Sequence, residues 1–227
     1  RSDAIIIASY NKADKTLKLV SLMRDMYVPI PGYSDNRLNA AYSFGGIQLL
    51  DKTIEKDFRV PIDGTVEVNF EGFTKLVDLL KGLDVKLSKA EAGHLNKKFG
   101  WKLTEGQNHL NGQQALEYAR IRHIGNGDFE RTDRQRILLT NMYDSISRLN
   151  MTKKYQILSK ILPYLTTDMS KQEILGYACA VLTGGIQSTE SYRIPAEGGY
   201  KIAKIRDMAV LVPNLAKARA LLKACIC

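Results

Sequence analysis

Short apolar runs alternate along this chain with segments whose apolar residues recur at helical spacing, and this alternation constrains the fold most. Residues 4–10 and 16–22 are β-branched-rich runs on either side of a polar segment, which predicts a β-hairpin. Helical spacing follows in residues 47–58 and 132–149. Mixed elements of this kind predict a single α/β (α+β) domain over residues 1–227, with a central mixed β-sheet flanked by helices.

The remaining elements are predicted from shorter signals. Residues 35–46 and 89–112 are polar and rich in glycine or asparagine, which predicts loops, the second of them a lid with at most a small helix. We also expect strands at 66–70, 84–87 and 192–194, and helices at 73–82, 113–120, 155–165, 170–182 and 213–224, the fourth opened by a capping box.

Composition and charge leave several partner classes open. The 227 residues are 44% apolar and 25% charged, which is typical of a globular protein and argues against a disordered tail or a coiled coil. The longest run without charge, residues 174–189, holds several glycines and polar residues and cannot cross about 30 Å of hydrocarbon. A net charge of +9 is compatible with nucleic acid, a membrane surface or a phosphorylated ligand.

The densest ionic feature is residues 120–136, which hold five arginines and no lysine. Guanidinium groups grip phosphate oxygens with two hydrogen bonds at once, so this stretch predicts a phosphate site. Arg131, Arg134 and Gln135 fall on one face of the predicted helix, close to an N-terminus that also favours anions. The alternative is a solvated helix face on which the arginines pair with neighbouring acidic residues.

A second ionic feature lies at one end of the predicted hairpin. Arg1 and Asp3 open its first strand, and Arg24 and Asp25 close its second, so antiparallel pairing places the two sets side by side. Carboxylates in such a position suit Mg²⁺, which binds through one or two carboxylates together with substrate phosphates. Strand caps and edge charges are the alternative.

Other kinds of site receive less support. The chain has no phosphate-binding glycine loop, no CxxC cysteine pair and no serine-hydrolase elbow, and His94, His109 and His123 are scattered. A nucleic-acid site needs aromatic residues among the basic ones, and the arginine stretch offers only Phe129, so we expect no nucleic-acid partner. The apolar stripe at Phe70 is ordinary core unless a lipid must be housed.

Seven motifs in sequence order resemble the LytR–CpsA–Psr family of Gram-positive bacteria. They cover residues 1–149 and are RSD at 1–3, SLMRDMYV with IPG at 21–32, LNAAYSFGG at 38–46, VNFEGF with LVD at 68–78, LNGQQAL at 110–116, YARIR at 118–122, and GDFER with RQ at 127–135.

The resemblance implies an Mg²⁺-dependent phosphotransferase on the outer face of the cytoplasmic membrane. Such an enzyme moves an anionic or secondary wall glycopolymer from a polyprenyl pyrophosphate carrier onto peptidoglycan through a phosphodiester. The family carries an N-terminal transmembrane anchor, which we expect upstream of Arg1, and a hydrophobic tunnel between sheet and helices. A hydrolase of the same lipid-linked intermediate and a non-catalytic envelope regulator are the alternatives, and no oligomeric state is implied.

Roles follow from the matching positions. Catalytic positions are expected at Arg24, Asp25, Arg122, Asp128 and Arg131, with the two aspartates as acid/base or positioning groups. The implied metal ligand is Asp3. Contacts to the pyrophosphate head are expected from Arg1, Arg120, Arg134 and Gln135, and contacts to the lipid from Phe44, Val68, Phe70, Phe73 and Leu76, with Val77 and Leu80 as further tunnel candidates.

Overall fold

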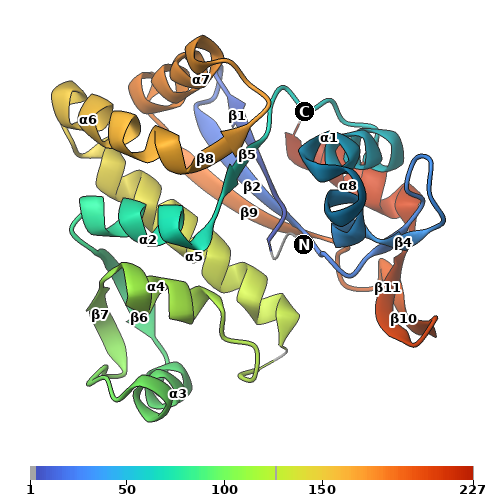
Figure 1. The fold of residues 1–227 in the computed structure, drawn as a ribbon, viewed down its shortest axis with the longest axis horizontal. Coiled ribbons are helices and arrows are strands. Elements are labelled where there is room, and N and C mark those ends of the chain that lie inside the picture. Colours follow the sequence, from blue (N-terminus) through green and yellow to red (C-terminus); the bar gives the residue numbers. More distant parts are fainter. Residues whose placement is uncertain (1–3, 126, 227) are drawn as a thin grey trace. The chain divides into compact units, whose positions relative to one another are not determined.

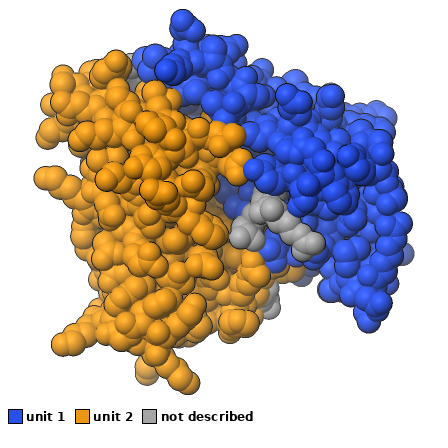
Figure 2. Space-filling model, in the orientation of Figure 1, with its two compact units in different colours: residues 1–65, 167–227 blue, residues 66–166 orange. Residues whose placement is uncertain are grey.

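The computed structural model describes residues 4–125 and 127–226 and divides the chain into two compact units. Unit 1 consists of residues 1–65 and 167–227, and unit 2 consists of residues 66–166 (Figure 2). The second unit is therefore an insertion in the first. Each unit is described below by itself.

Unit 1 contains a three-stranded mixed sheet (Figure 1). The hairpin formed by β1 (Ile6–Asn11) and β2 (Thr16–Leu22) is antiparallel, as predicted, and β9 (Ser188–Ile194) pairs with β2 in parallel. Six of the seven residues of β2 are buried, because it is the central strand. A hydrogen bond of 2.8 Å from Leu22 N to Ile5 O places the start of the first strand beside the end of the second. The predicted mixed α/β class is confirmed.

Three helices complete unit 1: α1 (Leu38–Phe58), α7 (Lys171–Gly184) and α8 (Leu215–Ile226). The predicted loop at 35–46 is wrong from Leu38 onward, since α1 already begins there and is only kinked at Gly45 and Gly46. The glycines of this segment correctly indicated irregular backbone, but within α1 the non-helical backbone is confined to Gly45 and Gly46. The predicted capping box at Ser170 opens α7.

Small strands accompany the sheet of unit 1. β3 (Tyr27–Val28) pairs with β4 (Asn36–Arg37), and β10 (Tyr200–Ile205) forms a hairpin with β11 (Met208–Pro213). This second hairpin was not predicted from the sequence. Its turn, at Arg206 and Asp207, adopts positive φ without glycine, so the usual turn signal is missing.

Unit 2 is mainly helical. Its elements in chain order are β5 (Val66–Val68), α2 (Phe70–Leu79), β6 (Leu83–Leu87), α3 (Lys89–Phe99), β7 (Gly106–Leu110), α4 (Gly112–Ala119), α5 (Asp128–Ser147), α6 (Met151–Ile161), a 3₁₀ turn (Leu162–Tyr164) and β8 (Leu165–Thr167). The strands form two pairs, β5 with β8 and β6 with β7. Among the helices that the structure describes, in either unit, none is both long and apolar enough to cross a bilayer.

The segment predicted as a loop-rich lid over residues 89–112 is instead regular structure. Helix α3 is opened by a capping box between Ser88 and Glu91, and β7 pairs antiparallel with β6. Helix α3 is polar over most of its surface and buries few apolar residues, Ala92 and Leu95 among them. That narrow apolar face explains why periodicity did not reveal it.

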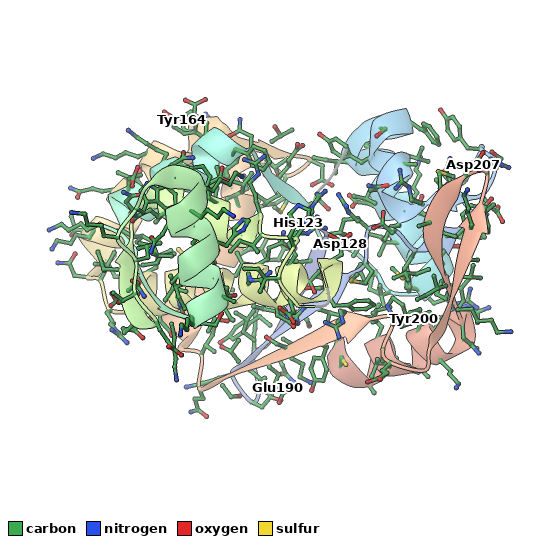
Figure 3. All side chains as sticks on the ribbon, turned by 90° about the horizontal axis from the view of Figure 1, so that it is seen from below. His123, Asp128, Tyr164, Glu190, Tyr200 and Asp207 are labelled. Carbon is green, nitrogen blue, oxygen red and sulfur yellow. The ribbon has the colours of Figure 1, made fainter. Side chains whose placement is uncertain are left out.

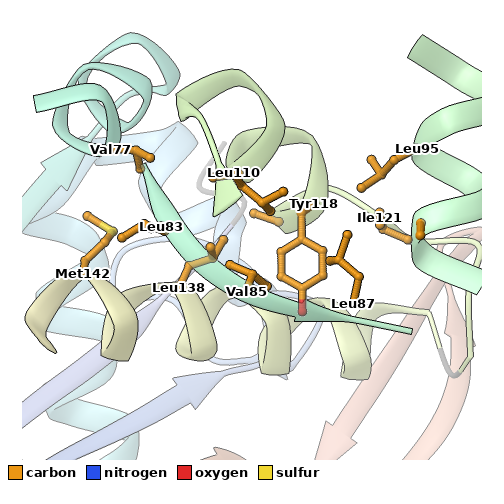
Figure 4. Packing of buried hydrophobic residues seen from close by; sticks show 13 residues of the cluster. Val77, Leu83, Val85, Leu87, Leu95, Leu110, Tyr118, Ile121, Leu138 and Met142 are labelled. Carbon is orange, nitrogen blue, oxygen red and sulfur yellow. The ribbon is translucent and has the colours of Figure 1, made fainter. Parts of the chain in front are cut away.

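A single hydrophobic cluster holds unit 2 together (Figure 4). It joins α2, the β6–β7 pair, α3, α4 and α5 through buried residues that include Val77, Val85, Leu95, Tyr118 and Leu138. Leu138 and Met142 of α5 are buried, whereas Ile137 of the same helix is 43% exposed. The cluster fixes the last turn of α4 and the middle of α5, so it anchors the helices on both sides of the loop that joins them.

Candidate active site

The first candidate cluster lies in unit 1, just after β2. Asp25 stands between two guanidinium groups, with Arg24 Nε 3.5 Å and Arg37 Nη1 3.3 Å from its carboxylate oxygens. The three side chains are 16–22% exposed, so a ligand in solution can approach all of them. The predicted neighbours Arg24 and Asp25 are thus brought together in one ionic cluster.

Arg37 is a member of this cluster that the sequence analysis missed. It lies in β4, whose pairing with β3 returns the chain toward Asp25. Its Nε is buried and has no hydrogen-bond partner among the described residues. A short strand pair after Arg24 was the signal that could have revealed it, but two-residue strands leave no periodic pattern in a sequence.

The second candidate cluster lies in unit 2, where the loop after α4 meets the start of α5. Asp128 is the first residue of α5, and Figure 3 labels it together with His123 of the preceding loop. Its Oδ1 lies 3.0 Å from Arg131 Nη1 and 3.8 Å from Arg122 Nε. The Arg131 side chain is 3% exposed, against 25% for Asp128 and 44% for Arg122.

Arg134, which was predicted to contact the substrate, is buried and hydrogen-bonded to other groups of the protein. Its side chain is 3% exposed and donates to Glu91 Oε1 at 2.6 Å, to Ile121 O at 3.1 Å and to Glu130 Oε2 at 3.0 Å. Burial by itself would raise the pKa of Glu91, but the hydrogen bonds from Arg134 and Ser88 outweigh it and hold that pKa below its usual value. Arg134 therefore ties α5 to α3 and to the loop.

Gln135 and Arg120 have environments that suit ligand contact. The Oε1 atom of Gln135 is buried and has no hydrogen-bond partner in the part of the chain that the structure describes. Arg120 is 51% exposed, donates to Glu117 Oε1 at 2.8 Å, and lies with its guanidinium carbon 5.0 Å from the centre of the Phe70 ring. Arg120 of unit 2 therefore contacts both a charged residue, Glu117, and an exposed aromatic residue, Phe70.

The predicted lipid-contacting residues separate into two groups. Val68 and Phe70 are 42% and 48% exposed, as is the neighbouring Val66 at 44%. By contrast Val77 is fully buried in the core of unit 2, and Phe73, Leu76 and Leu80 pack against that core. In unit 1, Phe44 is 42% exposed and stacks on Tyr33 with ring centres 4.8 Å apart.

The predicted metal ligand Asp3 and the predicted phosphate ligand Arg1 lie outside the described residues. Within residues 4–125 and 127–226, no three His, Cys, Asp or Glu side chains group closely enough to hold a metal ion. Asp25 and Asp128 each face two guanidinium groups instead. The described carboxylates by themselves do not fit a magnesium site.

Two curated relatives show what the sequence is similar to. Regulatory protein MsrR of Staphylococcus aureus is 30% identical over 204 residues, which are 88% of this chain and 61% of MsrR. The polyisoprenyl-teichoic acid–peptidoglycan teichoic acid transferase TagU of Enterococcus faecalis is 38% identical over 173 residues, 75% of this chain and 55% of TagU. The chain thus spans less than two thirds of the length of these two relatives.

Solved structures of the protein TagT have the same fold. TagT bound to LIIa-WTA matches with a TM-score of 0.85 at 27% identity, covering 99% of this chain and 84% of TagT. TagT with bound octaprenyl pyrophosphate lipid matches with a TM-score of 0.78 at 26% identity, covering 100% of this chain and 85% of TagT. Residues 1–223, which run through both units, match the family model LytR_cpsA_psr. The chain therefore belongs to the LytR–CpsA–Psr family.

Proposed function

We propose that this protein is a phosphotransferase that attaches an anionic or secondary cell-wall glycopolymer, delivered on a polyprenyl pyrophosphate carrier, to peptidoglycan. The observation that carries the proposal is the cluster of Asp128 with Arg122 and Arg131, in a chain whose family includes a teichoic acid transferase. TagT, which shares the fold, binds a prenyl pyrophosphate lipid.

The reaction needs positioning and charge compensation more than covalent help from the protein. A peptidoglycan hydroxyl oxygen forms a bond to the phosphorus on the polymer side. The bond from that phosphorus to the bridging oxygen breaks, and the lipid monophosphate leaves with the electron pair. Arg122 and Arg131 supply positive charge to the phosphate oxygens, and Asp128 or Asp25 accepts the hydroxyl proton.

The lipid part of the donor fits the exposed apolar residues. Val66, Val68 and Phe70 lie in sequence at the start of unit 2 and expose between 42% and 48% of their surface. Arg120 contacts the Phe70 ring, so a cation that suits a phosphate adjoins an apolar surface that suits a prenyl chain. We assign the prenyl chain to this surface and the pyrophosphate to Arg120 and Arg122.

Magnesium and location complete the proposal. We infer from the family resemblance that Asp3 would hold Mg²⁺, which would offset the negative charge of the pyrophosphate. A prenyl-linked donor and a peptidoglycan acceptor place the reaction on the outer face of the cytoplasmic membrane. Chelation of Mg²⁺, and separately Asp3→Ala, should both lower transfer, and normal transfer in both would remove magnesium from the proposal.

The test is a transfer assay with a prenyl-pyrophosphate-linked oligosaccharide and peptidoglycan. Arg122→Ala should lower the rate about 100-fold, because donors to the phosphate oxygens act most strongly in the transition state. Arg148→Ala is the matched control, since Arg148 is an exposed arginine at the other end of α5. Normal transfer by Arg122→Ala would contradict the proposal.

The products decide between transfer and the alternatives. Polymer that becomes linked to peptidoglycan supports the transferase. Polymer that is released free indicates a hydrolase of the lipid-linked intermediate. A wild-type protein that does neither while binding the donor indicates a non-catalytic regulator.

A further inference from the structure

Unit 2 contains a hollow of about 290 Å³ that shares Arg120 and Arg122 with the proposed pyrophosphate site and extends to residues to which that proposal gives no role. This volume is close to the lower end of pockets that hold small ligands. Its wall is formed by the second half of α3, the end of α4 and the following loop, through His94, Lys98, Phe99, Glu117, Arg120, Ile121, Arg122 and His123.

The hollow carries an excess of positive charge. Its one carboxylate, on Glu117, is 7% exposed and already lies 2.8 Å from Arg120 Nη1 and 3.5 Å from Lys98 Nζ. Arg122, which also lies 3.8 Å from the carboxylate of Asp128, adds a third cation to the wall, so the lining residues themselves carry three positive charges and one negative charge before either histidine is counted. A concave site of this sign attracts an anion.

An aromatic surface adjoins these charges. Phe99 lines the hollow and stacks on Trp101, with ring centres 4.5 Å apart and planes 19° apart. Lys98 Nζ lies 4.8 Å from the centre of the Phe99 ring. The faces of aromatic rings pack well against the C–H faces of sugar rings. A carboxylate accepts hydrogen bonds from sugar hydroxyl groups, and the cations bind an acidic group of the sugar.

The wall is held in place from behind. Leu95 of α3, Tyr118 of α4 and Ile121 of the loop belong to the hydrophobic cluster of unit 2 (Figure 4). Leu95 and Tyr118 are next to lining residues in the chain, and Ile121 is itself a lining residue, so the core fixes both helices and the loop that form the wall. The hollow is therefore preformed, which lowers the cost of ordering a ligand.

We propose that this hollow is a subsite for one negatively charged sugar unit of the reaction. The inference rests on the proposed function, because Arg120 and Arg122 belong both to the wall and to the expected pyrophosphate contacts. An acidic sugar of the donor glycan and a muramoyl sugar of the acceptor share the required chemistry. The alternative is that Lys98 and Arg120 have only a structural role, in which they offset the partial negative charge at the C-terminal ends of α3 and α4.

The experiment uses the single tryptophan of the chain as a reporter. Trp101 stacks on a lining residue, so its fluorescence should change when the hollow is filled. The probes are farnesyl pyrophosphate, farnesyl-pyrophosphate-linked glucose, farnesyl-pyrophosphate-linked glucuronic acid and N-acetylmuramoyl dipeptide. The variants are Lys98→Ala and its matched control Lys97→Ala, an exposed lysine of α3 that does not line the hollow.

Lys98→Ala should weaken binding of the glucuronic acid donor about tenfold and leave the glucose donor unchanged, whereas Lys97→Ala should change neither. The same loss for the muramoyl dipeptide alone would assign the subsite to the acceptor. Equal affinities for every probe in Lys98→Ala and wild type, or an equal loss for farnesyl pyrophosphate itself, would overturn the subsite. Failure of wild type to bind any farnesyl probe would instead contradict the proposed function, and muramoyl binding would still test the subsite.

Discussion

Each unit of this protein presents an aspartate between two arginines, but the two clusters differ in how they are exposed. In unit 1, Asp25 and its two arginines are all 16–22% exposed. In unit 2, Arg131 is 3% exposed while Arg122 on the other side of Asp128 is 44% exposed. The first cluster is uniform, and the second has a buried member and an exposed member.

This difference suggests a division of work within the second cluster. A buried guanidinium acts in a medium of lower dielectric constant, so its interaction with an anion is stronger and less screened by salt. An exposed guanidinium keeps its water and adapts to incoming ligands. We therefore expect Arg131 to hold Asp128 and the reacting phosphate, and Arg122 to receive the donor.

The largest expected effect tests this division directly. Arg131→Ala should lower the transfer rate about 1,000-fold, while Arg24→Ala in the evenly exposed cluster should lower it about 100-fold. Rates measured at several salt concentrations should show a weaker salt dependence for the contribution of Arg131. Thermal unfolding of each variant checks that the protein is folded during the assay. Equal losses in the two variants would remove the distinction between the clusters.

Asp57 of unit 1 lies outside the arginine cluster, and its buried carboxyl group makes the stability of the protein depend on pH. Asp57 is 3% exposed, its Oδ2 has no hydrogen-bond partner among the described residues, and burial raises its pKa to about 6 against the opposing charges of Lys56 and Arg219. The folded-state pKa lies above the unfolded one, so its contribution to stability is complete below about pH 4 and is lost as the pH rises through 6.

Asp57→Asn should therefore raise the free energy of unfolding at pH 8 by about 2 kcal/mol and leave it nearly unchanged at pH 4. Urea unfolding at pH 4, 6 and 8 measures the difference. Asp63→Asn, at an exposed position of the same unit, is the control. A variant that is no more stable than wild type at pH 8 would show that the Asp57 carboxylate is stabilised by contacts other than those described.

The smallest expected effect comes from arginine-to-lysine substitutions, which separate the charge of the arginine side chain from the shape of its guanidinium group. Lysine keeps the charge of arginine but cannot form two parallel hydrogen bonds to one phosphate. Arg122→Lys should raise the KM for the lipid-linked donor about tenfold, and Arg37→Lys about threefold, since Arg37 Nη1 is already 3.3 Å from Asp25. Steady-state kinetics at saturating peptidoglycan measures both, and a larger effect at Arg37 would reverse the order of the two clusters.

Local patterns predicted the elements whose signals are complete within a few residues. The β1–β2 hairpin, α4 and the capping box of α7 all appear where expected. Helix α3 had an equally local signal, Ser88 followed three residues later by Glu91, but its polar surface suggested a loop. The cap was the better predictor, because it depends on backbone hydrogen bonds and not on burial.

The candidate site was predictable in composition but less so in geometry. Helical spacing correctly placed Arg131, Arg134 and Gln135 on one face of α5, yet it could not show that Glu91, from a distant segment, holds Arg134 in the interior. Arg37 was missed for the same reason, since its partner Asp25 is reached only through the β3–β4 pairing. Burial and pairing over long sequence distances depend on the packed fold.

The insertion of unit 2 has a consequence for the order of folding. Strands β2 and β9 must pair across a separation of 172 residues, as the contact of Thr16 with Ser188 shows, and closing so long a loop is slow. The chain enters and leaves unit 2 through the paired strands β5 and β8, next to a 2.8 Å hydrogen bond from Thr167 Oγ1 to Thr65 O. Once residues 66–166 have folded, their ends are already together, and the effective length of that loop falls by more than half. We therefore expect that unit 2 folds first and that its folding accelerates the pairing of β2 with β9.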